Sequence, residues 1–362
     1  MAQDPVWIDY EDRFAEAYRG FAEAEFGREC YQAEQSYIDW LYKENPNSEG
    51  YRDFSIGVAG DRVIGCIHKM YLPWTIGGER VRVPSLHNLM MAAEYRSGGG
   101  FWLLKRSLNR ERHAVIPSSL PPLSIVYRQM KCQRVPAQWF RTIVRPVSGG
   151  VRMLLNRLRH TPNADVRRLS GNMTIAGCAV TTQPDADQLG RLAEALRRSQ
   201  GIDHVDWNEE TVRWRFFHPF GPLHGYARLG SADQFALISL GPRDGLGAGR
   251  LIYISDASST TEGVTKARRI LTAAGAHVAL AMTAHENVAE SLLAAGFRAY
   301  PFEQETYFYH RDQQFVQHTL AGSEIMDVGF EAVPRGVLRS GGASRRHGSL
   351  SDHSRAAANS LS

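Results

Sequence analysis

The first 48 residues carry large apolar side chains at roughly helical spacing. Phe14, Tyr18 and Phe21 recur every three or four positions, and a second apolar run, 37–42, ends at Asn45-Pro46. This periodicity predicts helices. Because an aromatic stripe of this kind packs into a core more often than it binds a ligand, we expect these residues to be structural.

From residue 51 the pattern changes to short apolar runs separated by turns. The runs predict one strand pair around Gly60-Asp61 and another around Gly77-Gly78. A further strand-like run, Leu89 to Met91, leads into Ser97 and three glycines, and 101–104 favours a helix directly afterwards. The remaining elements of the first half are a strand at 113–116, a helix over 123–130 and a strand at 139–140.

The second half repeats this order with different side chains. Trp40-Leu41-Tyr42 is echoed by Trp214-Arg215-Phe216, and Cys132 to Pro136 is echoed by Phe297 to Pro301. Strands are expected at 226–229, 235–238, 251–254 and 277–282, and helices at 263–274 and 286–295. Such self-similarity predicts two tandem copies of one fold.

Composition excludes several classes of protein. At 362 residues the chain can form two domains, and 43% hydrophobic with 22% charged residues is typical of a globular protein. No run of about 18 apolar residues and no secretory signal is present, so a cytoplasmic protein without a spanning helix is expected. The four cysteines are scattered singly, which favours reduced thiols, and no His/Cys cluster has metal-ligand spacing.

The formal charge of +4 is confined to one end of the chain. From Arg335 to Ser362 there are five arginines and one acid, so the rest of the chain is formally neutral. A neutral body lacks the basic footprint of a nucleic-acid-binding protein, and we expect no nucleic-acid partner.

The glycine cluster combines a strand, a turn and a helix start. This arrangement leaves backbone N–H groups free at a helix N-terminus, where they can hold a phosphate. The spacing is neither that of a dinucleotide-binding G-x-G-x-x-G nor that of a P-loop. Taken by itself, the cluster favours an ordinary strand-to-helix turn over a phosphate site.

The stretch resembles the pyrophosphate loop of the GCN5-related N-acetyltransferases (GNAT), written Arg/Gln-x-x-Gly-x-Gly/Ala. Arg96-Ser97-Gly98-Gly99 matches the Arg-x-x-Gly part and follows Glu94-Tyr95, while Phe101 replaces the last small residue. The order of elements over 1–145 also matches. The resemblance implies an α/β (α+β) chain of two acyl-CoA N-acyltransferase-like domains, each a mixed, mostly antiparallel sheet flanked by helices.

Four segments are expected on this basis. An N-terminal catalytic domain would span 1–147, a basic linker helix 148–170, a degenerate C-terminal domain 171–333 and a disordered tail 334–362. Nine Lys/Arg residues and no acid occupy 112–164, so the linker helix could be simply solvated, contact CoA phosphates or an anionic acceptor, or touch a membrane through 151–159.

The resemblance implies a set of donor-binding residues in the first copy. Backbone groups of the strand before the loop would hold pantetheine and polarise the thioester carbonyl, and the loop would hold the pyrophosphate. The residues at these places are Leu89, Met90, Met91, Arg96, Ser97, Gly98, Gly99, Gly100 and Phe101.

Three residues are candidates for proton transfer. Tyr127 lies where the family often has a tyrosine that protonates the departing thiolate, and a tyrosine, with an ordinary pKa of about 10, can act as that acid. His87, with an ordinary pKa of about 6.5, is the first candidate base and Glu94 the second. Asn88 replaces a common acidic residue, which allows a base acting through water. His68 and His113 are weaker alternatives.

The second copy departs from the pattern. Asp256 and Glu262 flank the turn that corresponds to the glycine loop, and Leu292 replaces Tyr127. Negative charges beside a helix N-terminus repel a pyrophosphate. This copy is therefore expected to be a structural support, an acceptor-binding wall or a dimer surface.

The sequence as a whole predicts an acyl-CoA-dependent N-acyltransferase. The expected co-substrate is acetyl-CoA or another acyl-CoA, the acceptor is an amine of a small molecule, amino sugar or peptide, and no metal is needed. The alternatives are a non-catalytic scaffold that keeps the fold, and an aminoacyl-tRNA-dependent transferase. The sequence does not fix the oligomeric state.

Overall fold

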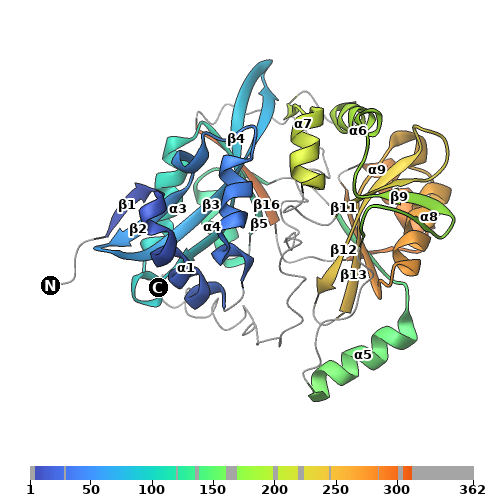
Figure 1. The fold of residues 1–362 in the computed structure, drawn as a ribbon, viewed down its shortest axis with the longest axis horizontal. Coiled ribbons are helices and arrows are strands. Elements are labelled where there is room, and N and C mark those ends of the chain that lie inside the picture. Colours follow the sequence, from blue (N-terminus) through green and yellow to red (C-terminus); the bar gives the residue numbers. More distant parts are fainter. Residues whose placement is uncertain are drawn as a thin grey trace. The chain divides into compact units, whose positions relative to one another are not determined.

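Two sheets organise the chain (Figure 1). The computed structural model describes residues 5–27, 30–119, 121–134, 138–159, 169–198, 203–218, 224–243, 246–283, 285–300 and 305–311. These residues form two units. The first takes the described residues up to 134 together with 305–311, and the second takes 138–300.

The first unit begins with helices and continues with long strands. Its helices are α1 (Ala15–Phe26), α2 (Gln35–Ile38), α3 (Gly99–Arg110) and α4 (Pro121–Gln129). Its strands are β1 (Val6–Asp9), β2 (Ser55–Ala59), β3 (Arg62–Ile76), β4 (Glu79–Met91), β5 (His113–Ser119), β6 (Gln133–Arg134) and β16 (Glu305–His310). Their order in the sheet is β1-β2-β3-β4-β5-β16-β6. In this order only β4 and β5 run parallel.

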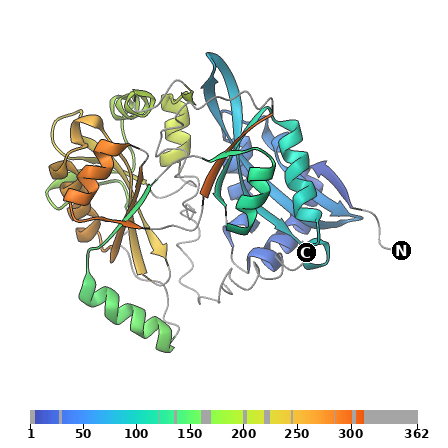
Figure 2. The ribbon, with the colours of Figure 1, turned by 180° about the vertical axis from the view of Figure 1, so that it is seen from behind.

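Helices cover both faces of this first sheet. Helix α1 lies on the face seen in Figure 1, and α3 and α4 lie on the opposite face, seen in Figure 2. Side chains alternate along a strand, so Ile67 packs against α3 whereas His68 contacts Tyr18 of α1. The turns expected at Gly60-Asp61 and Gly77-Gly78 are present, but the runs between them form one continuous strand, β3.

The second unit has the same plan. Its helices are α5 (Pro146–Arg159), α6 (Ala186–Arg198), α7 (Glu209–Val212), α8 (Thr261–Ala273) and α9 (Glu286–Ala294). Its strands are β7 (Gln138–Ile143), β8 (Asn172–Ile175), β9 (Cys178–Thr181), β10 (His204–Val205), β11 (His224–Arg228), β12 (Phe235–Arg243), β13 (Leu246–Ile254), β14 (Val278–Thr283) and β15 (Arg298–Tyr300). Eight of these strands form the second sheet in the order β15-β7-β14-β13-β12-β11-β9-β8, with only β13 and β14 parallel, and β10 is not part of this sheet.

The internal repeat is visible in local geometry. The two aromatic runs that echo each other both form a π-helical turn, Asp39–Lys43 and Arg213–Phe217. Helices α4 and α9 also end alike. The amide of Cys132 donates to the carbonyl of Tyr127, and the amide of Phe297 donates to that of Leu292, each at 2.9 Å. The two tandem copies expected from the sequence are confirmed.

Each copy gives its last strand to the other sheet. Strand β7 lies between β14 and β15, while β16 lies between β5 and β6. The boundary expected at residue 147 therefore differs from the structure, because 138–143 hydrogen-bonds in the second sheet and 305–310 in the first. Hydrogen bonds between strands distant in sequence decide this, and strand propensity does not encode them.

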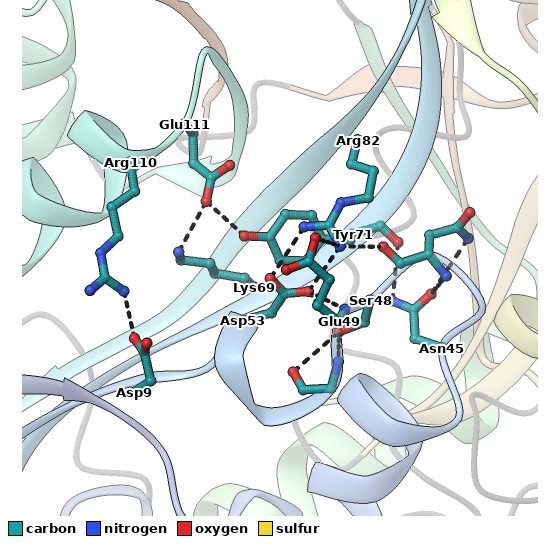
Figure 3. Close-up of polar contacts among 12 residues, drawn as sticks. Asp9, Asn45, Ser48, Glu49, Asp53, Lys69, Tyr71, Arg82, Arg110 and Glu111 are labelled. Atoms are coloured by element: carbon teal, nitrogen blue, oxygen red, sulfur yellow. Dashed lines mark hydrogen bonds and ion pairs between the residues drawn. The ribbon is translucent and has the colours of Figure 1, made fainter.

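A buried ion pair joins the end of α3 to the first sheet (Figure 3). The Lys69 ammonium, 2% exposed, lies 3.1 Å from the Glu111 carboxylate, which also accepts a 2.6 Å hydrogen bond from Tyr71. Burial and Glu111 raise the pKa of Tyr71, so its hydroxyl stays protonated. Asp53 and Arg82 form a second pair nearby at 3.3 Å. The partners satisfy each other, so we assign both pairs to structure.

Helix α5 covers part of the segment that was expected to be a basic linker helix. It spans Pro146–Arg159, and the rest of the expected segment, 160–168, lies outside the described residues, as does the expected tail, 334–362. Val147, Val151 and Leu154 follow one another at helical spacing and are all exposed. Contact of this helix with a membrane or with phosphates remains a prediction.

Candidate active site

The pairing between strands β4 and β5 has a gap in the first unit. They share one rung, Ser85 with Val115, and the described residues form no further rung between these strands towards Met91. Beyond that point, β4 keeps its partner β3 on one side, and within the described residues its other edge has no strand partner. An unpaired strand edge presents backbone donors and acceptors that an extended ligand can use.

A β-bulge shapes the edge of β4 beside this gap. The β3–β4 register passes from His68 opposite His87 to Cys66 opposite Met90, so β4 holds one extra residue. Asn88 adopts a left-handed backbone conformation at this bulge, with φ of 49°. A bulge turns two consecutive side chains to the same face. His87 and Asn88 both contact Tyr37 as a result.

Hydrogen bonds fix the tautomer of His87. Its Nδ1 lies 3.1 Å from the carbonyl of Ser85, and because a carbonyl only accepts, Nδ1 carries the proton. The other nitrogen, Nε2, then accepts from the Tyr37 hydroxyl at 3.2 Å. Asn88 Nδ2 lies 3.5 Å from the same hydroxyl oxygen. The half-buried ring therefore donates through Nδ1, and its Nε2 lies against a hydroxyl that can exchange partners.

His68 lies behind His87 and is fully buried. The two rings stack with centroids 5.7 Å apart, and the hydroxyls of Tyr18 and Tyr42 lie 2.8 and 3.4 Å from the His68 nitrogens. Burial, followed by the nearby His87, holds the pKa of His68 well below its ordinary value. A neutral, inaccessible imidazole can support His87 but cannot reach a substrate.

The glycine turn caps α3 with backbone alone. Gly98 is the N-cap with φ of 89°, no side chain caps the helix, and the first turn contains no acid. Gly98 is exposed, and Gly99 and Gly100 are partly exposed. The amides of this first turn meet the requirements of an anion site, and only glycine takes up the Gly98 conformation without strain.

Comparisons with known proteins show which fold the chain shares. A comparison with models of protein families finds no match, and neither does a comparison with curated proteins. Among solved structures, N-myristoyltransferase from Saccharomyces cerevisiae with bound myristoyl-CoA is 12% identical, with a TM-score of 0.55 over 86% of this chain and 80% of that one.

Two bacterial structures are similar in the same way. A GCN5-related N-acetyltransferase from Kribbella flavida is 17% identical, with a TM-score of 0.52 over 86% of this chain and 72% of that one. Another, from Anabaena variabilis, is 10% identical with a TM-score of 0.52 over 84% and 72%. The chain has the GNAT fold, in two tandem copies.

The second GNAT-like copy has its helix N-terminus closed. Thr260 caps α8 by accepting from the amide of Gly263 at 3.2 Å, and Glu262 occupies the first turn. A Cβ on Gly263 would come within 2.0 Å of the carbonyl oxygen of Ser258, so this turn is tightly filled. The expectation that the acids of this turn repel a pyrophosphate stays a prediction.

Tyr127 lies on the other face of β4 from His87. It is 4% exposed on α4, in a cluster that includes Met91, and its ring lies 5.3 Å from that of Tyr307 on β16. Leu89 packs against the same cluster. The proposed acid and base thus face opposite sides of the strand that borders the gap.

Glu94 lies away from His87. Its carboxylate pairs with Arg62 at 2.8 Å. Arg62 is the first residue of β3 and lies six positions before His68. At about 3.3 Å per residue, the pair is roughly 20 Å along the sheet from His87. A hydrogen bond from the backbone and, second, the hydrogen bond from the Arg62 side chain hold the pKa of Glu94 below its ordinary value. The surface ion pair accounts for Glu94 without a role as base.

Arg96 braces the loop that it begins. Its Nε donates to the carbonyl of Met91 at 3.1 Å, and its guanidinium pairs with Glu25 of α1 at 2.5 Å. Ser97 is exposed, Met90 is half-buried, and Phe101 is 45% exposed in the first turn of α3 beside Trp102 at 61%. No sequence signal identifies Glu25 as the partner of Arg96 or Tyr37 as the partner of His87, because both partners come from helices distant in sequence.

Proposed function

We propose that the protein is an acyl-CoA-dependent N-acyltransferase and that the first unit holds its active site. The observation that carries the proposal is the uncapped N-terminus of α3 at Gly98, directly after a strand whose free edge borders a gap. The N-terminus of α3 can hold a diphosphate, and the free edge of the strand before it can hold an amide-bearing arm. The bound thioester would supply the activated acyl group.

The donor would lie along β4. Amides of Gly99, Gly100 and Phe101 would hold the diphosphate, with Ser97 and Gly98 lining the turn. Backbone groups of Leu89, Met90 and Met91 would bind the arm and donate to the oxygen on which negative charge develops. Arg96 acts mainly by fixing this loop, because Glu25 already pairs with its charge.

The acceptor amine would approach from the His87 face. A neutral Nε2 can remove the amine proton, directly or through the Tyr37 hydroxyl that now occupies it. Tyr127, on the opposite face, would donate a proton to the departing thiolate. Attack and departure then proceed on two sides of the same gap.

The finer proposal is that acetyl is the acyl group and that a primary amine of a small molecule, amino sugar or peptide accepts it. The fold alone does not set the chain length of the acyl group, since the solved yeast structure with this fold holds myristoyl-CoA. Donor and acceptor preference therefore need a direct measurement.

Two measurements test the proposal. Calorimetry should show saturable binding of acetyl-CoA, and a thiol-release assay with acyl-CoAs of two to fourteen carbons should show turnover with at least one of a panel of amines. Binding without turnover on any donor and amine would favour the non-catalytic scaffold. Absence of acyl-CoA binding would refute the proposed function.

A further inference from the structure

A cavity of about 340 Å³ opens in the second unit, where its two parallel strands part. Its walls come from β13 (Leu251 to Ile254), from β14 (Ala281 to Thr283) and from the start of α9. The volume is at the lower end of the range for small-molecule sites, roughly 300–1,000 Å³.

The backbone of this cavity suits an extended chain. The rungs between β13 and β14 end at Leu251 opposite Ala281, yet β13 remains paired with β12 as far as Ile254, and β14 with β7 as far as Thr283. Within the described residues, the facing edges of the last residues of both strands therefore have no strand partner. Such edges bind amide-bearing chains by β-strand addition.

The charges around the cavity disfavour an anion. Asp256 lines its mouth, is exposed and makes no ion pair among the described residues. Arg198, the cation in the lining, pairs with Glu194. Because Thr260 caps the amide of Gly263 and Glu262 stands in the first turn of the nearby helix, a diphosphate would meet negative charge there.

The remaining lining supplies an apolar surface and a polar atom. Met282, Val288 and Leu292 form an apolar wall. The Nε2 of His285, also in the lining, has no hydrogen-bond partner in the described part of the chain. A ligand with an apolar side chain, amide groups and a positive charge would use all of these features.

We propose that this cavity binds a short, extended peptide segment that carries a positive charge next to an apolar side chain. The peptide backbone adds to the free strand edges, Asp256 attracts the cation, and the apolar side chain packs against Val288. The residues that line it belong to the second unit, so the proposal does not depend on the thioester site.

The test uses the full chain without any acyl-CoA. The probe is the peptide amide Ala-Leu-Ala-Ala with a free N-terminus, compared with its N-acetylated form, and binding is followed by ligand-observed NMR titration. The expected result is saturable binding that weakens about tenfold on N-acetylation. Asp256→Asn should remove this preference, whereas Glu262→Gln, a matched exposed carboxylate outside the cavity, should keep it.

A variant that fills the cavity gives a second readout. Val288→Trp, at a half-buried position on α9, should lower the affinity at least tenfold and leave acetyl-CoA binding unchanged. No saturable binding of the free peptide up to about 10 mM would overturn the proposal. The proposal would also be overturned if Asp256→Asn and Glu262→Gln changed the preference for the free peptide equally. The same holds if acetyl-CoA displaced the bound peptide in the Gly99→Val variant.

Discussion

The pair His87 and Asn88 shows what one extra residue in a strand can do. In a regular strand neighbouring side chains point to opposite faces, but the bulge turns both towards Tyr37. Ser85 then fixes the tautomer by accepting from Nδ1. A histidine and a hydroxyl are thereby held beside the gap in a geometry suited to proton removal.

His87→Gln should lower turnover with the best amine by roughly 100-fold, because general-base catalysis contributes 10²–10⁴. Wild-type kcat/KM should fall as the pH is lowered, since only the neutral imidazole accepts a proton, and the variant should lose this decrease. Steady-state rates from pH 5.5 to 8.5 measure both. An unchanged pH profile in His87→Gln would assign the base elsewhere.

Tyr127→Phe should lower kcat by about 100-fold and change the KM for acetyl-CoA by less than twofold, because it removes the acid but leaves the donor contacts. Tyr309→Phe is the matched control, since Tyr309 packs against the same cluster from β16. Equal turnover of Tyr127→Phe and Tyr309→Phe would leave Tyr127 with a packing role only.

His68 should make stability depend on pH. Its pKa is lowered in the folded state, whereas the unfolded chain titrates near 6.5, so the unfolded state binds more protons below that pH. This contribution to stability is present above pH 6.5 and is lost as the pH falls, by up to about 1.4 kcal/mol per pH unit. Urea unfolding of wild type and His68→Gln from pH 5 to 7 measures the free energy of unfolding at each pH. This free energy should change less with pH in the variant than in wild type. An equal pH dependence in both proteins would contradict a lowered pKa of His68.

At the scale of elements, the two helix N-termini after β4 and β13 differ in one decisive respect. Helix α3 begins at Gly98 with its amides uncapped, whereas α8 begins with a Thr260 cap and Glu262. The sequence showed the glycines of the first turn and the acids Asp256 and Glu262 of the second, but it did not identify Thr260 as the cap. It could not predict that Glu25 of α1 pairs with Arg96, because that contact joins elements 71 positions apart.

Gly99→Val should raise the KM for acetyl-CoA at least tenfold. The added side chain would contact Met91 and Tyr95 and shield the first-turn amides, since a Cβ at Gly99 lies 2.9 Å from the Met91 methyl carbon. Gly20→Val, at an open position on α1, is the control. An acetyl thioester without a diphosphate, S-acetyl-N-acetylcysteamine, should react equally with wild type and Gly99→Val. A KM for acetyl-CoA that stays the same in Gly99→Val would refute the loop assignment.

At the scale of the whole molecule, the exchange of strands couples the two copies. The first sheet is completed by β16, so its stability depends on residues about 190 positions after β5. Within the described residues, no helix has the length and apolar character needed to cross a bilayer, and no cluster of three metal-ligating side chains occurs.

Tyr307→Ala should destabilise the first sheet by about 3–5 kcal/mol, the usual effect of truncating a buried aromatic residue. Hydrogen exchange measured by mass spectrometry should show faster exchange in β5, the partner of β16, and little change in β13. Tyr300→Ala is a control at a half-buried position on β15 of the other sheet. Faster exchange in β13 alone would contradict the observed pairing.

The sequence by itself determined the features that depend on near neighbours. It predicted the two copies, most helices and strands, the mixed sheets, the glycine turn and the acids beside the second turn, because periodicity and turn residues act over a few positions. Only the tertiary structure decided which sheet receives β7 and β16, where β4 bulges, and that Tyr37 meets His87. These features depend on hydrogen bonds and packing between distant segments, and many sequences with the same local pattern could form them differently.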